Sequence, residues 1–158
     1  TKFFSKIFNQ FKNSDNALNH YKLRTMCNSL SYVDYTNTLD HEFVGDNYPL
    51  LLQKYQSSIA ATTANYTIKY LEIPAAGCLS FMEVTDENHA NYLNFKDGEN
   101  AIFINEKNYQ EKFEEFLESP DNPEWERIAN SGREHVIKNF SNDVAVDSLV
   151  KLFKKILY

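Results

Sequence analysis

Short apolar runs alternate with amphipathic helical patterns through most of this chain, and this alternation constrains the fold more than any other feature. Runs rich in apolar and β-branched residues predict strands, whereas apolar residues repeated every three or four positions predict helices. Strands that alternate with helices are typical of a parallel sheet covered by helices. We therefore expect an α/β fold, with a parallel sheet flanked by helices.

The pattern places each expected element along the chain. Strands are expected at 31–36, 57–63, 78–84 and 101–104, while 3–11 fits either a strand or a short helix, of which we favour the strand. Helices are expected at 21–30, 47–56, 66–77 and 87–93. Gly77 is well placed to end the third of these helices, because glycine adopts a left-handed backbone without strain.

The last third of the chain differs, because three helical patterns follow one another with no strand between them. They cover 108–118, 123–140 and 142–157. Asn122 is a suitable N-cap for the second helix, and Pro123 suits its first turn. We expect these helices to close the domain by folding back over it.

Composition excludes several classes of protein. The 158 residues include 12 Phe and 10 Tyr, enough to form the core of one domain and too many for a disordered chain. A net charge of -6 disfavours a nucleic-acid partner, since phosphate binding needs clustered basic residues. No stretch is long and apolar enough for a membrane span, and no signal peptide opens the chain, so we expect a soluble, cytoplasmic protein. Cys27 and Cys78 are expected to be buried thiols.

One segment combines charged residues with the end of a predicted helix. Lys69 and Glu72 lie on the helix that leads into the strand at 78–84. Ligands of open α/β sheets bind outside the carboxyl ends of the strands, a place that suits a nucleotide diphosphate. The same two residues also fit a solvated helix face, which the residues alone favour.

From about residue 66 to 153 the sequence resembles the C-terminal half of GT-B glycosyltransferases, of the group 1 and spore-protein-like families. The similarity rests on the stretches 69–79, 87–90, 95–102, 123–129 and 132–136. Upstream it is thinner and rests on 21–24 and the helix from Tyr48. The resemblance implies that residues 1–158 form a single Rossmann-like domain that binds a nucleotide-sugar donor. It also implies that the chain is a fragment or one half of a two-domain protein, whose separate N-terminal domain handles the acceptor.

The resemblance also implies roles for six residues. Glu72 would accept hydrogen bonds from the ribose hydroxyls of the donor, and Lys69 and Arg24 would stabilise the departing diphosphate. The turn with Glu87, Asn88 and His89 would lie near the sugar or the diphosphate. No metal or other cofactor is expected, since the donor itself is the substrate.

Two departures from the family pattern support a second hypothesis. The family's two-glutamate motif would place an acid at position 64, where this chain has Ala64. A glycine-rich donor loop is also missing, and residues 85–88 stand in its place. The alternative is a non-catalytic binding or assembly module that keeps the fold. A flavodoxin-like signalling domain is a third, weaker hypothesis, and the acidic group at 40–42 is interpreted as a solvated loop.

Overall fold

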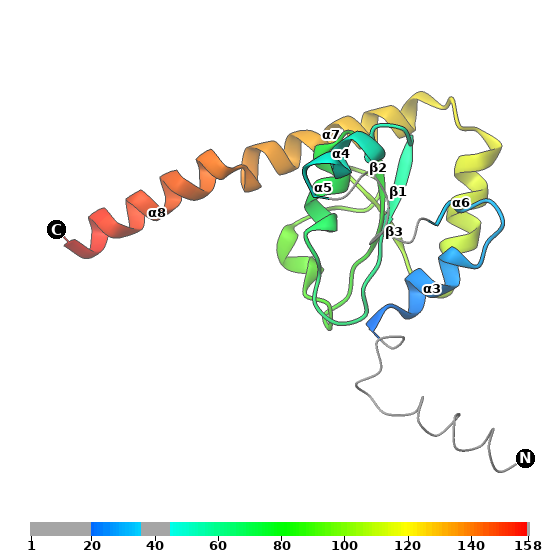
Figure 1. Ribbon diagram of the computed structural model, residues 1–158, viewed down its shortest axis with the longest axis horizontal. Coiled ribbons are helices and arrows are strands. Elements are labelled where there is room, and N and C mark those ends of the chain that lie inside the picture. Colours follow the sequence, from blue (N-terminus) through cyan, green and yellow to red (C-terminus); the bar gives the residue numbers. More distant parts are fainter. Residues whose placement is uncertain (1–19, 36–44, 158) are drawn as a thin grey trace, which may run out of the picture.

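The computed structural model describes residues 20–35 and 45–157, which form an α/β domain (Figure 1). Its described strands are β1 (Ser57–Ala60), β2 (Leu79–Glu83) and β3 (Ile102–Ile104), and they form one parallel sheet in the order β1-β2-β3. Ser57 lies opposite Leu79, and Phe81 lies opposite Ile102. The predicted fold class, a parallel α/β sheet flanked by helices, is confirmed.

Helices cover both faces of this sheet. The described helices are α3 (Lys22–Asn28), α4 (Tyr48–Leu52), α5 (Lys69–Ala75), α6 (Tyr109–Glu118), α7 (Pro123–Phe140) and α8 (Asn142–Leu157), with short 3₁₀ turns η1 (Gly45–Asn47) and η2 (Ala90–Leu93). Gly77 follows α5 with a φ of 88°, in agreement with its predicted role as a helix end.

The core consists of two apolar clusters, one on each face of the sheet. The first cluster joins α3 and α6 to the sheet, and Phe81 of β2 packs edge-on against Phe113 and Phe116 at ring-centroid distances of 4.9 and 5.9 Å. The second cluster joins α4 and α5 to the opposite face through Met82 of β2. Consecutive strand residues point to opposite faces, so the fully buried strand β2 serves both clusters.

Helix α7 matches its predicted limits and contributes to both clusters. Asn122 caps it by accepting a hydrogen bond from the Glu124 backbone N–H at 3.0 Å. At Gly132 the helix lies close to the backbone of Asn100, and an added Cβ would lie 2.5 Å from the Asn100 carbonyl oxygen. Because any Cβ at this position would clash, only glycine lets the helix pack at its present distance.

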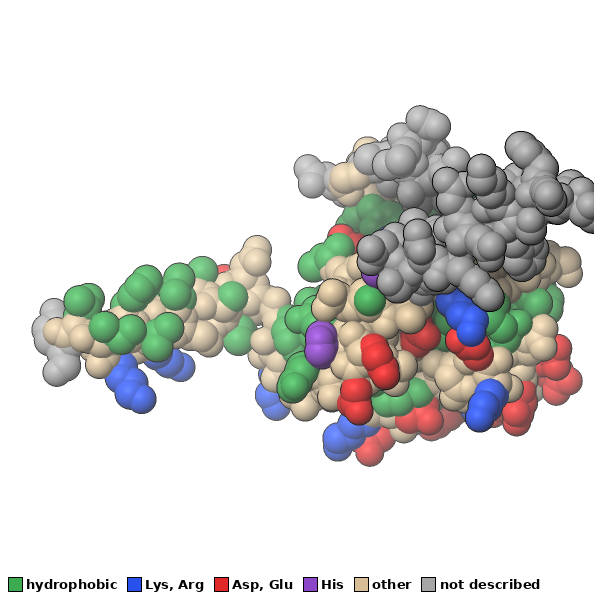
Figure 2. All heavy atoms as spheres, turned by 90° about the horizontal axis from the view of Figure 1, so that it is seen from below, with side chains coloured by type: hydrophobic (Ala, Val, Ile, Leu, Met, Phe, Trp, Pro, Cys, Tyr) green, Lys and Arg blue, Asp and Glu red, His purple; other side chains and the backbone are tan. Residues whose placement is uncertain are grey.

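Helix α8 also has its predicted limits, but the expectation that it folds back over the domain is wrong. None of its described side chains is buried, and it continues beyond α7 away from the body of the molecule (Figure 1). Figure 2 shows hydrophobic side chains along one side of this helix and lysines on another. No described helix is long and apolar enough to cross a bilayer.

The strand predicted at 31–36 is the clearest error within the described residues. Residues 31–35 form a turn and an irregular stretch, with the Val33 N–H donating to the Leu30 carbonyl at 3.1 Å. Tyr32 and Tyr35 are 41% and 61% exposed, so the β-branched and aromatic residues of this segment do not enter a sheet. The predicted strand at 3–11 and the acidic group at 40–42 lie outside the described residues.

Three other predicted helices are shorter than expected. Residues 47–56 contain α4 over only five residues, and 66–77 contain α5 over seven. Only the end of 87–93 is helical, as the 3₁₀ turn η2. Cys27 and Cys78 are both free thiols and are both buried, as predicted.

Candidate functional site

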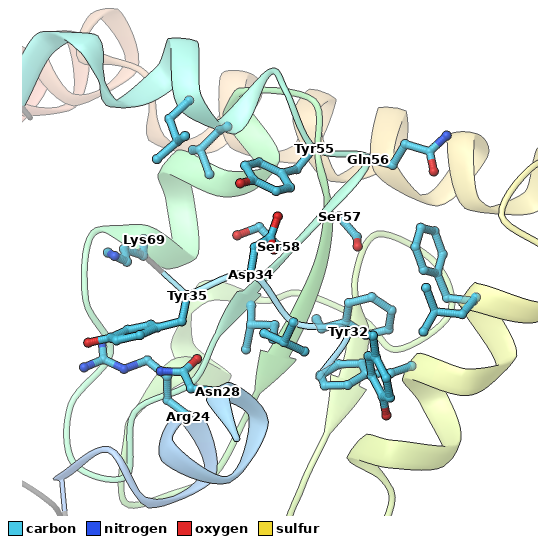
Figure 3. Close-up of a pocket in the computed structure, with 18 of the residues that line it drawn as sticks. Arg24, Asn28, Tyr32, Asp34, Tyr35, Tyr55, Gln56, Ser57, Ser58 and Lys69 are labelled. Atoms are coloured by element: carbon cyan, nitrogen blue, oxygen red, sulfur yellow. The ribbon is translucent and has the colours of Figure 1, made fainter. Parts of the chain in front are cut away.

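A cavity of about 400 Å³ lies along the outer edge of β1. Three consecutive β1 residues, Ser57, Ser58 and Ile59, line it, and consecutive side chains point to opposite faces of a strand. The cavity must therefore run along the edge of the sheet. Its other walls come from α3 and the segment after it, from α4, from the first residue of α5 and from α6 (Figure 3).

Arg24 and Lys69 bring two positive charges to this cavity from different elements. Arg24 lies on α3 and Lys69 begins α5, and both are half-buried. The Arg24 guanidinium lies 3.9 Å from the centre of the Tyr21 ring, and the Lys69 ammonium lies 5.1 Å from the centre of the Tyr48 ring. Neither cation forms an ion pair with any residue in 20–35 or 45–157.

The electrostatics agree with this geometry. Burial, and then the positive charge of Arg24, lower the pKa of Lys69, while Glu72 acts in the opposite direction. Two like charges that repel across a common cavity stabilise the fold less than two ion pairs would. They suit an anionic ligand, because an anion placed between them would relieve the repulsion and accept hydrogen bonds from both.

Glu72 lies beside this cavity rather than in its wall. It occupies the first turn of α5, one helical turn from Lys69, and is half-buried. Its negative charge raises the pKa of Tyr48, after the larger effect of burial, and counteracts the lowered pKa of Lys69. Glu72 thus offsets part of the effect of burial and of Arg24 on Lys69.

The other three predicted residues follow β2 and do not line the cavity. Glu87 and His89 are exposed, and His89 has a left-handed backbone with φ of 58°. Asn88 between them is completely buried. The structure therefore brings Arg24 and Lys69 together, places Glu72 next to them, and separates the group at 87–89.

Buried Asn88 joins the loops that follow β1 and β2. Its amide nitrogen donates to the carbonyls of Thr62 and Glu83 at 2.9 and 2.7 Å, and its amide oxygen accepts from the N–H groups of Thr85 and Ala90 at 3.1 and 3.0 Å. With its donors and acceptor used in this way, the Asn88 side chain holds the two loops against each other.

The buried Tyr70 hydroxyl lies at the same junction. It donates to the Glu83 carbonyl at 2.9 Å and accepts from the Thr62 N–H at 3.2 Å and from the Asn88 amide at 3.3 Å. Burial raises the pKa of Tyr70 to about 12, so the hydroxyl keeps its proton. Because Tyr70 follows Lys69 directly, this network fixes the end of α5 that carries Lys69 to the cavity.

Several cavity residues were not identified from the sequence. Asp34, Tyr35, Tyr55 and Ser58 all line the cavity. Asp34 and Tyr35 belong to the segment for which the sequence predicts a strand, and a strand assignment gives them no binding role. The sequence signal that could have identified them is the close succession of polar and aromatic residues at 31–35, which is as typical of a binding loop as of a strand.

The fold and the cavity define an α/β domain with a cationic, tyrosine-lined cavity at the edge of a parallel sheet. A family model described as glycosyl transferase-like matches residues 12–151. The chain belongs to this glycosyl transferase-like family, as its resemblance to glycosyltransferases predicted. No curated protein and no solved structure matches the chain.

Proposed function

We propose that this chain is the donor-binding domain of a glycosyltransferase and that it holds the diphosphate of a nucleotide sugar between Arg24 and Lys69. The observation that carries the proposal is the convergence of two cations, unpaired within the described part of the chain, on one cavity. Membership of the glycosyl transferase-like family supports the reaction class.

The size and lining of the cavity support a ligand of this kind. Sites for small ligands usually enclose about 300–1,000 Å³ and combine apolar walls with a few polar groups. The present cavity, at about 400 Å³, has four tyrosines, Tyr32, Tyr35, Tyr48 and Tyr55, in its wall. Tyrosine rings provide flat surfaces for a base or a sugar and hydroxyls for hydrogen bonds.

The two cations also suit the chemistry of sugar transfer. When the bond between the sugar and the diphosphate breaks, negative charge grows on the departing diphosphate, and fixed positive groups nearby lower the energy of that transition state. Arg24 can bind two oxygens at once, while Lys69 acts as a compact charge. We propose that these side chains supply the charge stabilisation without a bound metal.

We propose the GT-B arrangement for the complete enzyme, in which an N-terminal domain binds the acceptor and closes the active site. The free edge of β1 within the described residues and the exposed apolar face of α8 are compatible with a further domain. The proposal keeps the cytoplasmic location expected from the sequence. On this proposal the chain by itself binds donor and transfers sugar slowly or not at all.

Isothermal titration of the chain with UDP, GDP and their sugars tests the proposal. Arg24→Gln and Lys69→Gln should each weaken binding by about 10-fold or more, because each removes a charge-assisted contact worth about 1.5–3 kcal/mol. Arg133→Gln and Lys151→Gln are matched controls, since both change the same residue types at exposed positions outside the cavity.

Binding that is unchanged in both cavity variants would contradict the proposed site. An absence of binding by every nucleotide would contradict the donor-binding function itself and would favour the non-catalytic module suggested by Ala64.

A further inference from the structure

We infer that α8 is an interaction surface for a second copy of this chain, with the two helices paired antiparallel along their apolar faces. None of the residues that line the cavity belongs to α8. The inference is therefore independent of the proposed function, and its failure would leave the donor cavity untouched.

The apolar face of α8 is the first support. Its two central side chains, Leu149 and Phe153, are 49% and 53% exposed. Contiguous apolar surface of this kind on a folded domain is typical of a contact with another molecule. The apolar side chains recur at intervals of three, four and three residues, the spacing of the seam between the helices of a coiled coil: Val146, Leu149, Phe153 and Ile156.

The position of α8 makes this face accessible. The helix continues beyond α7 and away from the rest of the described domain (Figure 1), and hydrophobic side chains are visible along one side of it in Figure 2. None of its described side chains is buried. A partner can therefore contact the whole length of the helix, about 24 Å at about 1.5 Å per residue, without displacing a buried side chain of the domain.

The charges of α8 indicate which partner fits. One row of charged side chains flanks the apolar face, because its members follow one another at intervals of three or four residues and so lie on the same side of the helix. The row begins with acids and ends with bases: Asp143, Asp147, Lys151 and Lys154. None of these four charges forms an ion pair with any residue in 20–35 or 45–157.

An antiparallel second copy satisfies this order of charges. In a symmetric antiparallel pair the same flank of each helix faces its counterpart, and the partner's row runs in the opposite direction. The acids of each copy then lie opposite the lysines of the other. A parallel pair would bring different flanks together and would leave the acids and lysines without this match.

The same charges disfavour an anionic membrane surface as the partner. Helices that lie on such a surface are rich in Lys and Arg on their polar face, whereas Asp143 and Asp147 occupy the first half of this row. The net charge of -6 on the whole chain adds repulsion from anionic lipids. A second copy of the chain therefore fits the helix better than a membrane does.

Sedimentation equilibrium of the chain from about 1 µM to about 1 mM, the range in which weak complexes associate, measures the pairing. An interface of this length is small, and small interfaces are weak, so the chain should be a monomer at the lowest concentrations and a dimer at the highest. Leu149→Gln combined with Phe153→Gln should weaken association at least about 10-fold, because both side chains lie at the centre of the seam. Ser148→Gln, on the polar side of α8, is the matched control and should leave association unchanged.

Reversal of the charges tests the orientation. Asp143→Lys with Asp147→Lys leaves only bases in the row, and Lys151→Glu with Lys154→Glu leaves only acids. Each double variant should associate at least about 10-fold more weakly than the unsubstituted chain, since like charges then face each other. An equal mixture of the two double variants should associate again, because opposite charges are restored.

Three results would overturn the inference. A monomer at every concentration would mean that the apolar face of α8 has another occupant, such as a further domain. Association that is unchanged by Leu149→Gln and Phe153→Gln would place the contact elsewhere on the molecule. Charge-reversed variants that associate as tightly as the unsubstituted chain, or whose mixture does not associate, would contradict the antiparallel pairing. All the substituted side chains are exposed, so these variants are not expected to unfold the domain.

Discussion

At the scale of single residues, Glu83 is a carboxylate buried in the described core without full hydrogen bonding. It ends β2, is 8% exposed, and its Oε2 has no hydrogen-bond partner among the described residues. Burial, and then the negative charge of Glu106, raise the pKa of Glu83, while a backbone hydrogen bond from Thr62 and the Lys22 charge lower it. A buried ionised group that lacks full pairing destabilises the folded state.

We predict that Glu83→Gln stabilises the protein at pH 8 by about 1 kcal/mol or more, the scale of a buried polar group left without partners. A raised pKa means that the folded state holds this proton more tightly than the unfolded chain does. Protonation of Glu83 therefore stabilises the folded state fully below the ordinary pKa near 4.5. This stabilisation is lost as the pH rises through the raised pKa of the folded state.

Urea unfolding of the chain and the variant between pH 4 and pH 8 measures this effect. The difference in the free energy of unfolding should grow with pH. A difference that is constant across the range would show that ionisation of Glu83 is not its cause.

At the scale of elements, α8 differs from every other helix described. Large apolar side chains on this helix remain exposed, from Val150 at 43% to Leu157 at 74%. Lys154 and Lys155 lie in its last turn. Since an amphipathic helix gains most of its stability from packing, α8 contributes little to the fold of the domain.

We predict that deletion of residues 142–158 changes the free energy of unfolding of the domain by no more than about 0.5 kcal/mol, as expected when no buried contact is lost. Urea unfolding monitored at Trp125, which packs against the first core cluster, measures it. Deletion of residues 123–158 is the control: it also removes α7 with its buried residues and Trp125, so it is followed by far-ultraviolet circular dichroism, and it should abolish cooperative unfolding. A large loss of stability on the shorter deletion would mean that α8 packs against the domain in solution.

Local signals predicted some elements much better than others. Helix α7 could be placed from Asn122, Pro123 and a regular apolar stripe, because caps and periodicity act within the helix itself. The segment 31–35 could not be assigned correctly, because its tyrosines and valine have strand propensity but lie in the wall of a cavity. Whether such residues pair in a sheet depends on contacts far away in the sequence, which propensity does not contain.

At the scale of the whole molecule, the site is assembled from segments that lie far apart in the chain. Arg24 comes from α3, Lys69 from α5, and the lining residues Phe113 and Phe116 from α6. The resemblance to glycosyltransferases predicts a role for Arg24 and Lys69, and both line the cavity. Asp34 could not be predicted as a cavity residue in this way, because its place in the cavity wall follows only from the packing of the segment after α3 beside β1.

The same limit applies to the residues after β2. Glu87, Asn88 and His89 are polar neighbours in the sequence, and polar residues after a buried strand often bind ligands. In the structure Asn88 uses its amide to hold the loops after β1 and β2, while its two neighbours face solvent. Position in the sequence alone does not distinguish a buried side chain that holds a loop in place from a side chain that the loop exposes.

The most direct test of the central claim, that the cavity along β1 binds the diphosphate of a nucleotide, is a titration of the ¹⁵N-labelled chain with UDP followed by two-dimensional NMR. The account predicts that the largest shift changes occur at 24–35, 55–59 and Lys69, and that the same peaks do not move in an Arg24→Gln, Lys69→Gln double variant. Shift changes confined to 84–89, or of equal size in the double variant, would contradict it.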